Sequence, residues 1–151
     1  MLTGPNLILI GCVKSKRNRT SAAKDLYNSP LWRYRRKYAE QSSFPWYILS
    51  AEHGLLAPET EIKPYDVTLK EIPATKCRTW SQSVLDELMK EFPSLQGTVI
   101  EIHAGKRYVE FGLETGLRDA GAVIRRPLAG VIGIGAQCKW YRDQLATGSG
   151  E

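Results

Sequence analysis

The chain alternates short, continuous apolar runs with longer segments whose apolar residues recur every three or four positions. Four of the runs have the length of strands, and their continuity is typical of strands buried on both faces. They are Leu7–Gly11, Trp46–Ser50, Thr98–His103 and Ala122–Arg126. No Asn-Gly hairpin signal separates them. This pattern predicts a mainly parallel, four-stranded central sheet.

The segments between these runs have the periodicity of amphipathic helices. Ser29 stands in the N-cap position before Pro30, which predicts a helix over 29–41. Further helices are predicted over 75–92, 106–121 and 133–146. Because strands and helices alternate, we expect a single-domain α/β protein, a three-layer sandwich with helices on both faces of the sheet.

The composition fits one globular domain with a substantial core, since 42% of the 151 residues are hydrophobic and 25% are charged. We assign residues 1–146 to the α/β domain and residues 147–151 to a disordered tail. No apolar segment is long enough to cross a bilayer, and Leu7–Gly11 is too short for the apolar part of a signal peptide. A cytoplasmic protein without membrane contact is therefore expected.

The three cysteines form no Cys-x-x-Cys pair, which suits a reducing compartment. They are Cys12, Cys77 and Cys138. No metal site is predicted from these residues, and no cofactor is expected.

Positive charge gathers near the N-terminus, within a chain whose net charge is +5. Residues 14–37 hold nine lysines and arginines, opposed only by Asp25. Such a cluster favours an anionic partner, of which nucleic acid is the commonest. The alternative interpretation is a solvated basic face that keeps the protein soluble.

Small and polar residues follow each predicted strand, where open parallel α/β sheets bind their ligands. The segments read GCVKSK, SAEHG, HAGKRY and PLAGVIGIG. Lys14 and Lys16 in the first can meet phosphates, although the spacing is not that of a P-loop. Lys106 and Arg107 begin a predicted helix, where cations oppose the helix dipole unless an anion lies there. A phosphate contact is therefore favoured at both places.

The segment Lys-Pro-Tyr-Asp offers a carboxylate on a stiffened chain. Pro64 restricts the backbone, so Tyr65 and Asp66 are expected to be held in place. A held, ionised carboxylate can orient water or stabilise a developing positive charge. The alternative is a turn in which Asp66 caps a short helix.

Three other residues near the strand ends have less specific interpretations. Tyr27 suits either stacking on a base or packing in the core. His53 lies beside a glycine, where a structural hydrogen-bonding role is commoner than catalysis. Because no Gly-x-Ser-x-Gly motif is present, we predict no catalytic triad and interpret Ser50 as a hydrogen-bond donor.

Five segments resemble, in order, the motifs of a family of small bacterial and phage proteins labelled a domain of unknown function. They are LIGCVKSK, KDLYNSPLW, WYILSAEHGLLAPETEIKPYD, HAGKRY and PLAGVIGIG. The family includes the Brig-type antiphage DNA glycosylases and is distantly similar to YaaA-type DNA-binding stress proteins and uracil-DNA-glycosylase-like folds. The resemblance implies that the family's motif positions are Cys12, Lys14, Lys16, Tyr27, Ser29, Ser50, Gly54, Tyr65, Asp66, Gly105 and Tyr108.

The residues and the resemblance together favour a DNA N-glycosylase that excises a modified base, such as glucosylated hydroxymethylcytosine of phage DNA, in antiphage defence. Asp66 would stabilise an oxocarbenium-like state or orient water. The other expected catalytic residues are Tyr65, Ser50 and Lys14. A base flipped out of double-stranded DNA would meet the substrate-binding residues Cys12, Tyr27, Ser29, His53, His103 and Tyr108. The expected phosphate-binding residues are Lys16, Arg17, Arg36, Lys106 and Arg107.

We expect Asp66, Tyr65, Ser50, Lys14 and His103 to line one pocket. Asp25 and Glu52 are the other carboxylates near it. Two alternatives of different classes stay open: a DNA-binding stress protein without catalysis, and an N-glycosidase or transferase that acts on free nucleotides. The sequence indicates neither the base nor the oligomeric state.

Overall fold

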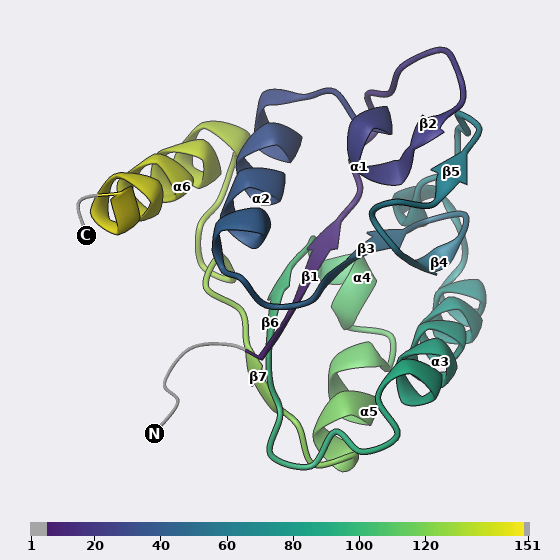
Figure 1. Ribbon diagram of the computed structural model, residues 1–151. Helices are drawn as coiled ribbons and strands as arrows, with labels where there is room; N and C mark the ends of the chain where they lie inside the picture. Colours follow the sequence, from purple (N-terminus) through teal and green to yellow (C-terminus); the bar gives the residue numbers. More distant parts are fainter. Residues whose placement is uncertain (1–5, 150–151) are drawn as a thin grey trace.

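A mostly parallel five-stranded sheet with helices on both faces forms the centre of the molecule, whose computed structural model describes residues 6–149 (Figure 1). The strand order is β4-β3-β1-β6-β7. The parallel strands are β1 (Leu7–Gly11), β3 (Trp46–Ser50), β6 (Val99–His103) and β7 (Val123–Arg125). The edge strand β4 (Gly54–Leu56) runs antiparallel to β3. The protein is therefore of the mixed α/β class.

The four predicted strands are present, and the sequence pattern missed three others. β4 returns directly from β3, because Gly54 adopts a φ of 71° that permits the tight turn. β2 (Ser21–Ala22) and β5 (Glu61–Ile62) form a separate antiparallel pair. These three strands are two or three residues long, so they carry no apolar run that periodicity could detect.

Helices occupy most of the segments in which they were predicted. They are α1 (Ala23–Leu26), α2 (Pro30–Gln41), the 3₁₀-helix η1 (Leu69–Glu71), α3 (Ala74–Glu91), α4 (Lys106–Val109), α5 (Leu113–Asp119) and α6 (Ile134–Ser149). Ser29 caps α2 as predicted, because its hydroxyl accepts a hydrogen bond from the Trp32 N–H at 3.1 Å. At η1 the capping side chain is Thr68, not Asp66.

Two helix predictions differ from the structure. The single helix expected over 106–121 is divided into α4 and α5, because Gly112 has a left-handed φ of 119° that interrupts it. The last helix, α6, continues to Ser149, so the first three residues of the tail predicted at 147–151 are helical. Residues 150 and 151 lie outside the described residues.

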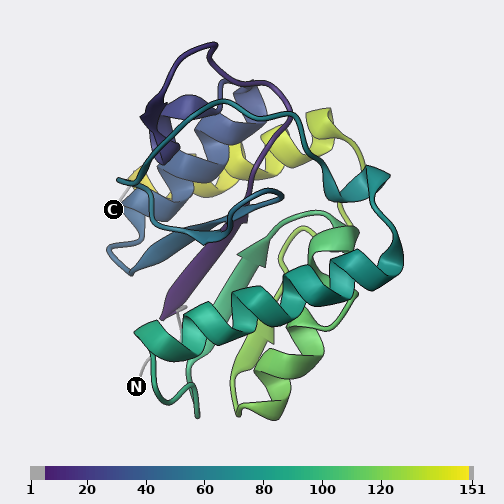
Figure 2. The ribbon, with the colours of Figure 1, turned by 90° about the vertical axis from the view of Figure 1, so that its right-hand side faces the viewer.

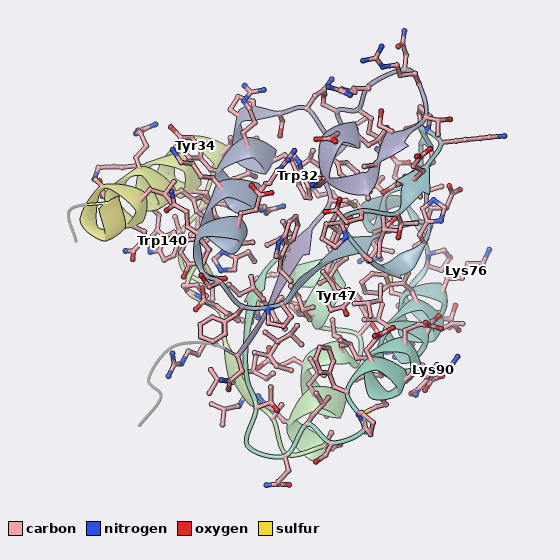
Figure 3. All side chains as sticks on the ribbon, in the orientation of Figure 1. Trp32, Tyr34, Tyr47, Lys76, Lys90 and Trp140 are labelled. Atoms are coloured by element: carbon pink, nitrogen blue, oxygen red, sulfur yellow. The ribbon has the colours of Figure 1, made fainter. Side chains whose placement is uncertain are left out.

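Each face of the sheet is covered by its own helices (Figure 2). One face packs Leu9 and Ile102 against α3, α4 and α5. The other face packs Ile8 and Ile10 against α1 and α2, with Trp32 as the largest buried side chain. α6 packs against α2 through a smaller cluster of Leu31, Cys138 and Tyr141. Tyr34 of α2 stacks on Tyr141 of α6, and Trp140 of α6 packs against Tyr38 of α2 (Figure 3).

Within residues 6–149, no helix combines the length and the apolar character needed to cross a membrane.

A buried polar network lies between β6 and the α2–α6 layer. His103 is fully buried, and its Nδ1 accepts a hydrogen bond from the Tyr141 hydroxyl at 2.6 Å. Its Nε2–H donates to Glu101 Oε1 at 2.7 Å, and the Tyr38 hydroxyl donates to the same oxygen at 2.5 Å. Burial lowers the pKa of His103 despite the nearby carboxylate. The network therefore holds a neutral imidazole.

Burial alone would raise the pKa of Glu101, but the hydrogen bonds from His103 and Tyr38 outweigh it and lower that pKa. The carboxylate is thus ionised, and two donors satisfy it inside the protein. Arg35 also acts on His103 and favours the neutral imidazole. The network joins α2, β6 and α6 through polar contacts.

We predict that the protein loses stability as the pH falls below about 6.5, the ordinary pKa of histidine. His103 stays neutral in the folded state but takes up a proton when unfolded, so its contribution is present above that pH and declines toward its lower folded pKa. Urea unfolding at pH 7.5, 6.5 and 5.5 measures how the free energy of unfolding changes with pH. His103→Asn should make the decline smaller, because the asparagine amide takes up no proton in this pH range. An unchanged slope in His103→Asn would contradict this assignment.

We predict that Gly11→Ala destabilises the fold by about 1–3 kcal/mol, because the end of β1 has no space for a methyl group. A Cβ there would lie 2.9 Å from the Ala104 Cβ and 3.4 Å from Arg35 Nη1. Gly135→Ala is the matched control, since no atom of the described residues lies within 4 Å of its Cβ position in α6. Its higher helix propensity should stabilise by about 0.5–1 kcal/mol. Equal free energies of unfolding for the two variants would refute the steric argument.

Candidate functional site

A chain of hydroxyl groups lies where β3 ends. The buried Ser50 Oγ donates to the Tyr65 hydroxyl at 2.9 Å, and the hydroxyls of Tyr65 and Tyr27 share a hydrogen bond of 2.5 Å. Ser50 Oγ also accepts the backbone N–H of His53 at 3.0 Å, and its carbonyl accepts the Trp80 indole N–H at 2.8 Å. These bonds attach the Lys-Pro-Tyr-Asp segment to the end of the sheet.

Lys16 covers this hydroxyl chain. Its Nζ lies 4.4 Å from the centre of the Tyr65 ring and 5.7 Å from the centre of the Tyr27 ring, both within cation–π range. The same ammonium group donates to the carbonyl of Lys14 at 2.9 Å. A backbone bridge also pairs Lys16 with Tyr27. The loop after β1 is thereby folded back over the tyrosines.

Several charges surround the Lys16 ammonium. Burial lowers the pKa of Lys16, and the neighbouring Lys14 acts in the same direction. The fields of Cys12, Asp66 and Glu52 oppose this effect. Asp66 and Glu52 are exposed, so they form a solvated acidic rim beside a half-buried cation. We call Lys16, Ser50, Tyr27, Tyr65 and Asp66 the Lys16 cluster.

Cys12 and Tyr108 form a second contact at this edge of the sheet. The Cys12 Sγ lies 3.2 Å from the Tyr108 hydroxyl, and the Tyr108 ring packs edge-on against Trp80. Burial raises the pKa values of Tyr27, Tyr65 and Tyr108, with Cys12 adding to the effect in each case. The three tyrosines are therefore neutral at physiological pH and suit hydrogen bonding better than proton abstraction.

The residues expected to bind phosphate lie in different surroundings. Lys14 and Arg17 are exposed on the loop after β1. Arg36 is held by Asp25 at 2.7 Å and by Glu40 at 3.2 Å, so it joins α2 to α1. Arg36 is therefore engaged inside the protein.

Arg107 is also engaged inside the protein. Its Nε and Nη2 donate to the carbonyls of Leu69 and Ile72, each at 2.7 Å, so it attaches α4 to the η1 segment. Lys106, its neighbour in sequence, is exposed. Of the predicted phosphate-binding residues, the structure leaves Lys106 and Arg17 exposed to solvent.

The predicted pocket is assembled only in part. Tyr65, Ser50 and Asp66 lie together around Lys16, and Lys14 meets this lysine through its carbonyl. His103 does not join them, because β6 points it into the network beneath α2 and α6. The alternation of side chains along β6 puts His103 on the same face as Glu101, which explains this placement.

Three predicted substrate-binding residues also have structural partners. Tyr27 is 3% exposed and packs on Trp32, so it belongs to the core. Ser29 uses its hydroxyl as the cap of α2. His53 is exposed on the turn between β3 and β4, edge-on to Tyr65 at 5.5 Å between ring centres. Of these three side chains, His53 is the most open to a ligand.

Sequence reasoning missed Arg35, which is 7% exposed and donates from Nη1 to the carbonyl of Gly11 at 2.8 Å. A signal was available, because Arg35 falls four residues after Leu31 on the apolar face of α2. Trp80 was predicted only as a helix residue, and its indole hydrogen bond to the Ser50 carbonyl had no signal in the sequence.

Residues 7–143 match a family described as "Family of unknown function (DUF6884)". The match covers most of the chain, and the protein belongs to this family. Neither a curated protein nor a solved structure matches the chain. The family match includes β1 through β7 and every residue of the Lys16 cluster.

Proposed function

We propose that this protein is a DNA N-glycosylase, which hydrolyses the bond between deoxyribose and a modified base. The observation that carries the proposal is the Lys16 cluster, in which a half-buried ammonium, an exposed carboxylate and neutral tyrosine hydroxyls meet at the carboxyl end of the sheet. Ligands of open α/β sheets bind at this edge. The exposed cations of the loop after β1 lie beside it.

The chemistry of base removal needs groups of these kinds. As the bond between C1′ and the base nitrogen breaks, its electron pair leaves with the base and the sugar becomes oxocarbenium-like. Lys16, with its lowered pKa, donates a proton to the departing base. Asp66 stabilises the cation and accepts a proton from the water that adds to C1′. The catalytic lysine in this proposal is Lys16, and Lys14 has a contact to DNA.

The tyrosines and Ser50 have a supporting role. Tyr27 and Tyr65 are neutral and hydrogen-bonded to each other, and the faces of their rings hold the Lys16 ammonium by cation–π contacts. A base flipped from the duplex would enter from the solvent side, next to His53 and Asp66. The motif resemblance to Brig-type antiphage glycosylases supports a hypermodified phage base as the substrate.

A DNA-binding protein without catalysis is the alternative on the same surface, since the exposed Lys14 and Arg17 can contact the phosphates of the DNA backbone. Action on free nucleotides is the other alternative. Incubation with natural and glucosylated phage DNA, followed by mass spectrometry of the products, distinguishes them. Release of a free base from DNA supports the glycosylase. Salt-sensitive binding without release supports the binding protein.

We predict that the double variant Lys14→Ala/Arg17→Ala binds duplex DNA more weakly and with a flatter salt dependence. Each lost phosphate contact should reduce the slope of log K against log salt by about 0.9. Lys76→Ala is the control, because Lys76 is exposed on α3, away from this loop (Figure 3). Fluorescence anisotropy over a salt series measures both quantities. An unchanged slope would identify the loop as solvated surface only.

We predict that Asp66→Asn lowers the rate of base release by about a hundredfold or more, because the charge facing the sugar cation is lost while the side-chain shape is kept. Thermal unfolding and DNA affinity should stay close to those of the wild type, since Asp66 is exposed. Glu52→Gln, at the other exposed carboxylate near Lys16, is the matched control. Near wild-type release by Asp66→Asn would exclude Asp66 as the catalytic carboxylate.

A further inference from the structure

A cavity of about 230 Å³ lies at the same edge of the sheet, where β6 and β7 end. It is located where the connections that leave two adjacent strands diverge: β1 leads to α2 on one face, and β6 leads to α4 on the other (Figure 2). Such a switch point is where open α/β sheets bind ligands. The polar and small lining residues include Arg35, Gly105, Lys106, Arg126, Gly133 and Gln137.

The lining is cationic. Among residues 6–149, three basic side chains contribute to it and no carboxylate does. Lys106 is exposed, whereas Arg126 is half-buried, with its Nη1 3.5 Å from Glu114. Arg35 is the most deeply buried of the three basic residues. A concentration of like charge around one small cavity is unfavourable unless an anion occupies it.

Two buried atoms of the lining residues have no hydrogen-bond partner. Arg35 donates from Nη1 to the carbonyl of Gly11, but its Nε–H is unsatisfied. The Oε1 of Gln137 is also unsatisfied, although the amide nitrogen of this residue donates to the carbonyl of Val131 at 3.4 Å. Buried polar groups in native proteins nearly always have partners. A charged donor and a neutral acceptor in one lining suit a ligand that carries both an anionic group and a hydroxyl or amino group.

The beginning of α6 adds further donors. Gly133 has a φ of 94°, and its carbonyl accepts the first hydrogen bond of the helix, from the Gln137 N–H at 3.1 Å. The N–H groups of the first turn have no acceptor within the helix, and this turn contains no acidic residue. Because Gly133 and Gln137 both line the cavity, the positive end of the helix dipole adds to the field of the arginines.

We propose that this cavity binds the phosphate monoester of a small hydroxyl-bearing ligand, such as a nucleoside monophosphate or a sugar phosphate. Arg35 and Arg126 bind the phosphate oxygens, and Gln137 accepts from the ligand's hydroxyl or amino group. A volume of about 230 Å³ lies below the roughly 300–1,000 Å³ of pockets for drug-sized ligands, which limits the occupant to one small molecule. The inference does not rest on the proposed function, since Lys16 and Asp66 do not line the cavity.

Isothermal titration calorimetry tests this proposal with inorganic phosphate, deoxycytidine monophosphate and deoxycytidine as probes. We expect saturable binding of the first two, and deoxycytidine should bind at least about tenfold more weakly than its monophosphate. Arg126→Gln and Lys106→Gln should each weaken monophosphate binding by about tenfold. Arg118→Gln is the matched control, because Arg118 also pairs with Glu114 but lies outside the cavity lining.

Arg35→Lys keeps the charge but removes the Nε–H and the planar geometry, so we expect the monophosphate to bind about tenfold more weakly or worse. Because Arg35 also supports Gly11, this variant is compared only if its thermal unfolding resembles that of the wild type, and the Arg126 and Lys106 variants decide the question otherwise.

The proposal would be overturned if phosphate did not bind saturably, or if Arg118→Gln weakened monophosphate binding as much as Arg126→Gln does. Displacement of deoxycytidine monophosphate by an oligonucleotide without terminal phosphates would also overturn it, because the site would then bind backbone diesters. If the protein releases no base from DNA but binds the monophosphate, and if Arg126→Gln weakens that binding, the cavity proposal is supported and only the glycosylase proposal is rejected.

Discussion

The hydrogen bond from Arg35 to the carbonyl of Gly11 holds together α2, the end of β1 and the segment after β6, on which both candidate sites depend. It attaches α2 to the end of β1, at the point where Gly11 lets Ala104 approach from β6. Burying a guanidinium group to this degree costs folding free energy unless each of its N–H groups finds an acceptor. The Gly11 carbonyl and the Tyr141 hydroxyl supply two partners, and Nε lacks one. The strand ends are therefore positioned around a charge that is incompletely satisfied.

Polar contacts as well as apolar packing hold α6 against α2 and the sheet. α6 contacts α2 through only a small cluster of buried apolar side chains. The hydrogen bonds of Tyr141 to His103 and of Tyr38 to Glu101 add directional contacts to the sheet beneath both helices. Because such bonds require one register, they determine how the start of α6 faces the cavity. An exchange of these groups for apolar ones would preserve burial but not orientation.

The sequence predicted the central strands because each contains a short, mostly apolar run, and in β1 that run is buried along its whole length. It did not predict β4, β2 or β5, whose pairing depends on the turn at Gly54 and on contacts between distant segments. The Ser50–Tyr65 contact was expected from the strand end and is present. The position of Lys16 over the Tyr65 ring was not predictable, since a loop conformation determines it. His103 lies away from the predicted pocket because side chains alternate along β6, which turns His103 to the same face as Glu101.

The three thiols differ in their accessibility to solvent, which allows a spectroscopic label to be attached at one of them. Cys77 and Cys138 are buried, while Cys12 is partly accessible between the Lys16 cluster and the segment after β6. A thiol-reactive fluorophore would therefore attach preferentially at one position, without engineering of the other cysteines. Cys12 acts on the Lys16 ammonium, and the Cys12–Tyr108 contact lies next to Gly105 of the cavity lining. A label at this one residue would therefore lie close to both regions of the unmutated chain.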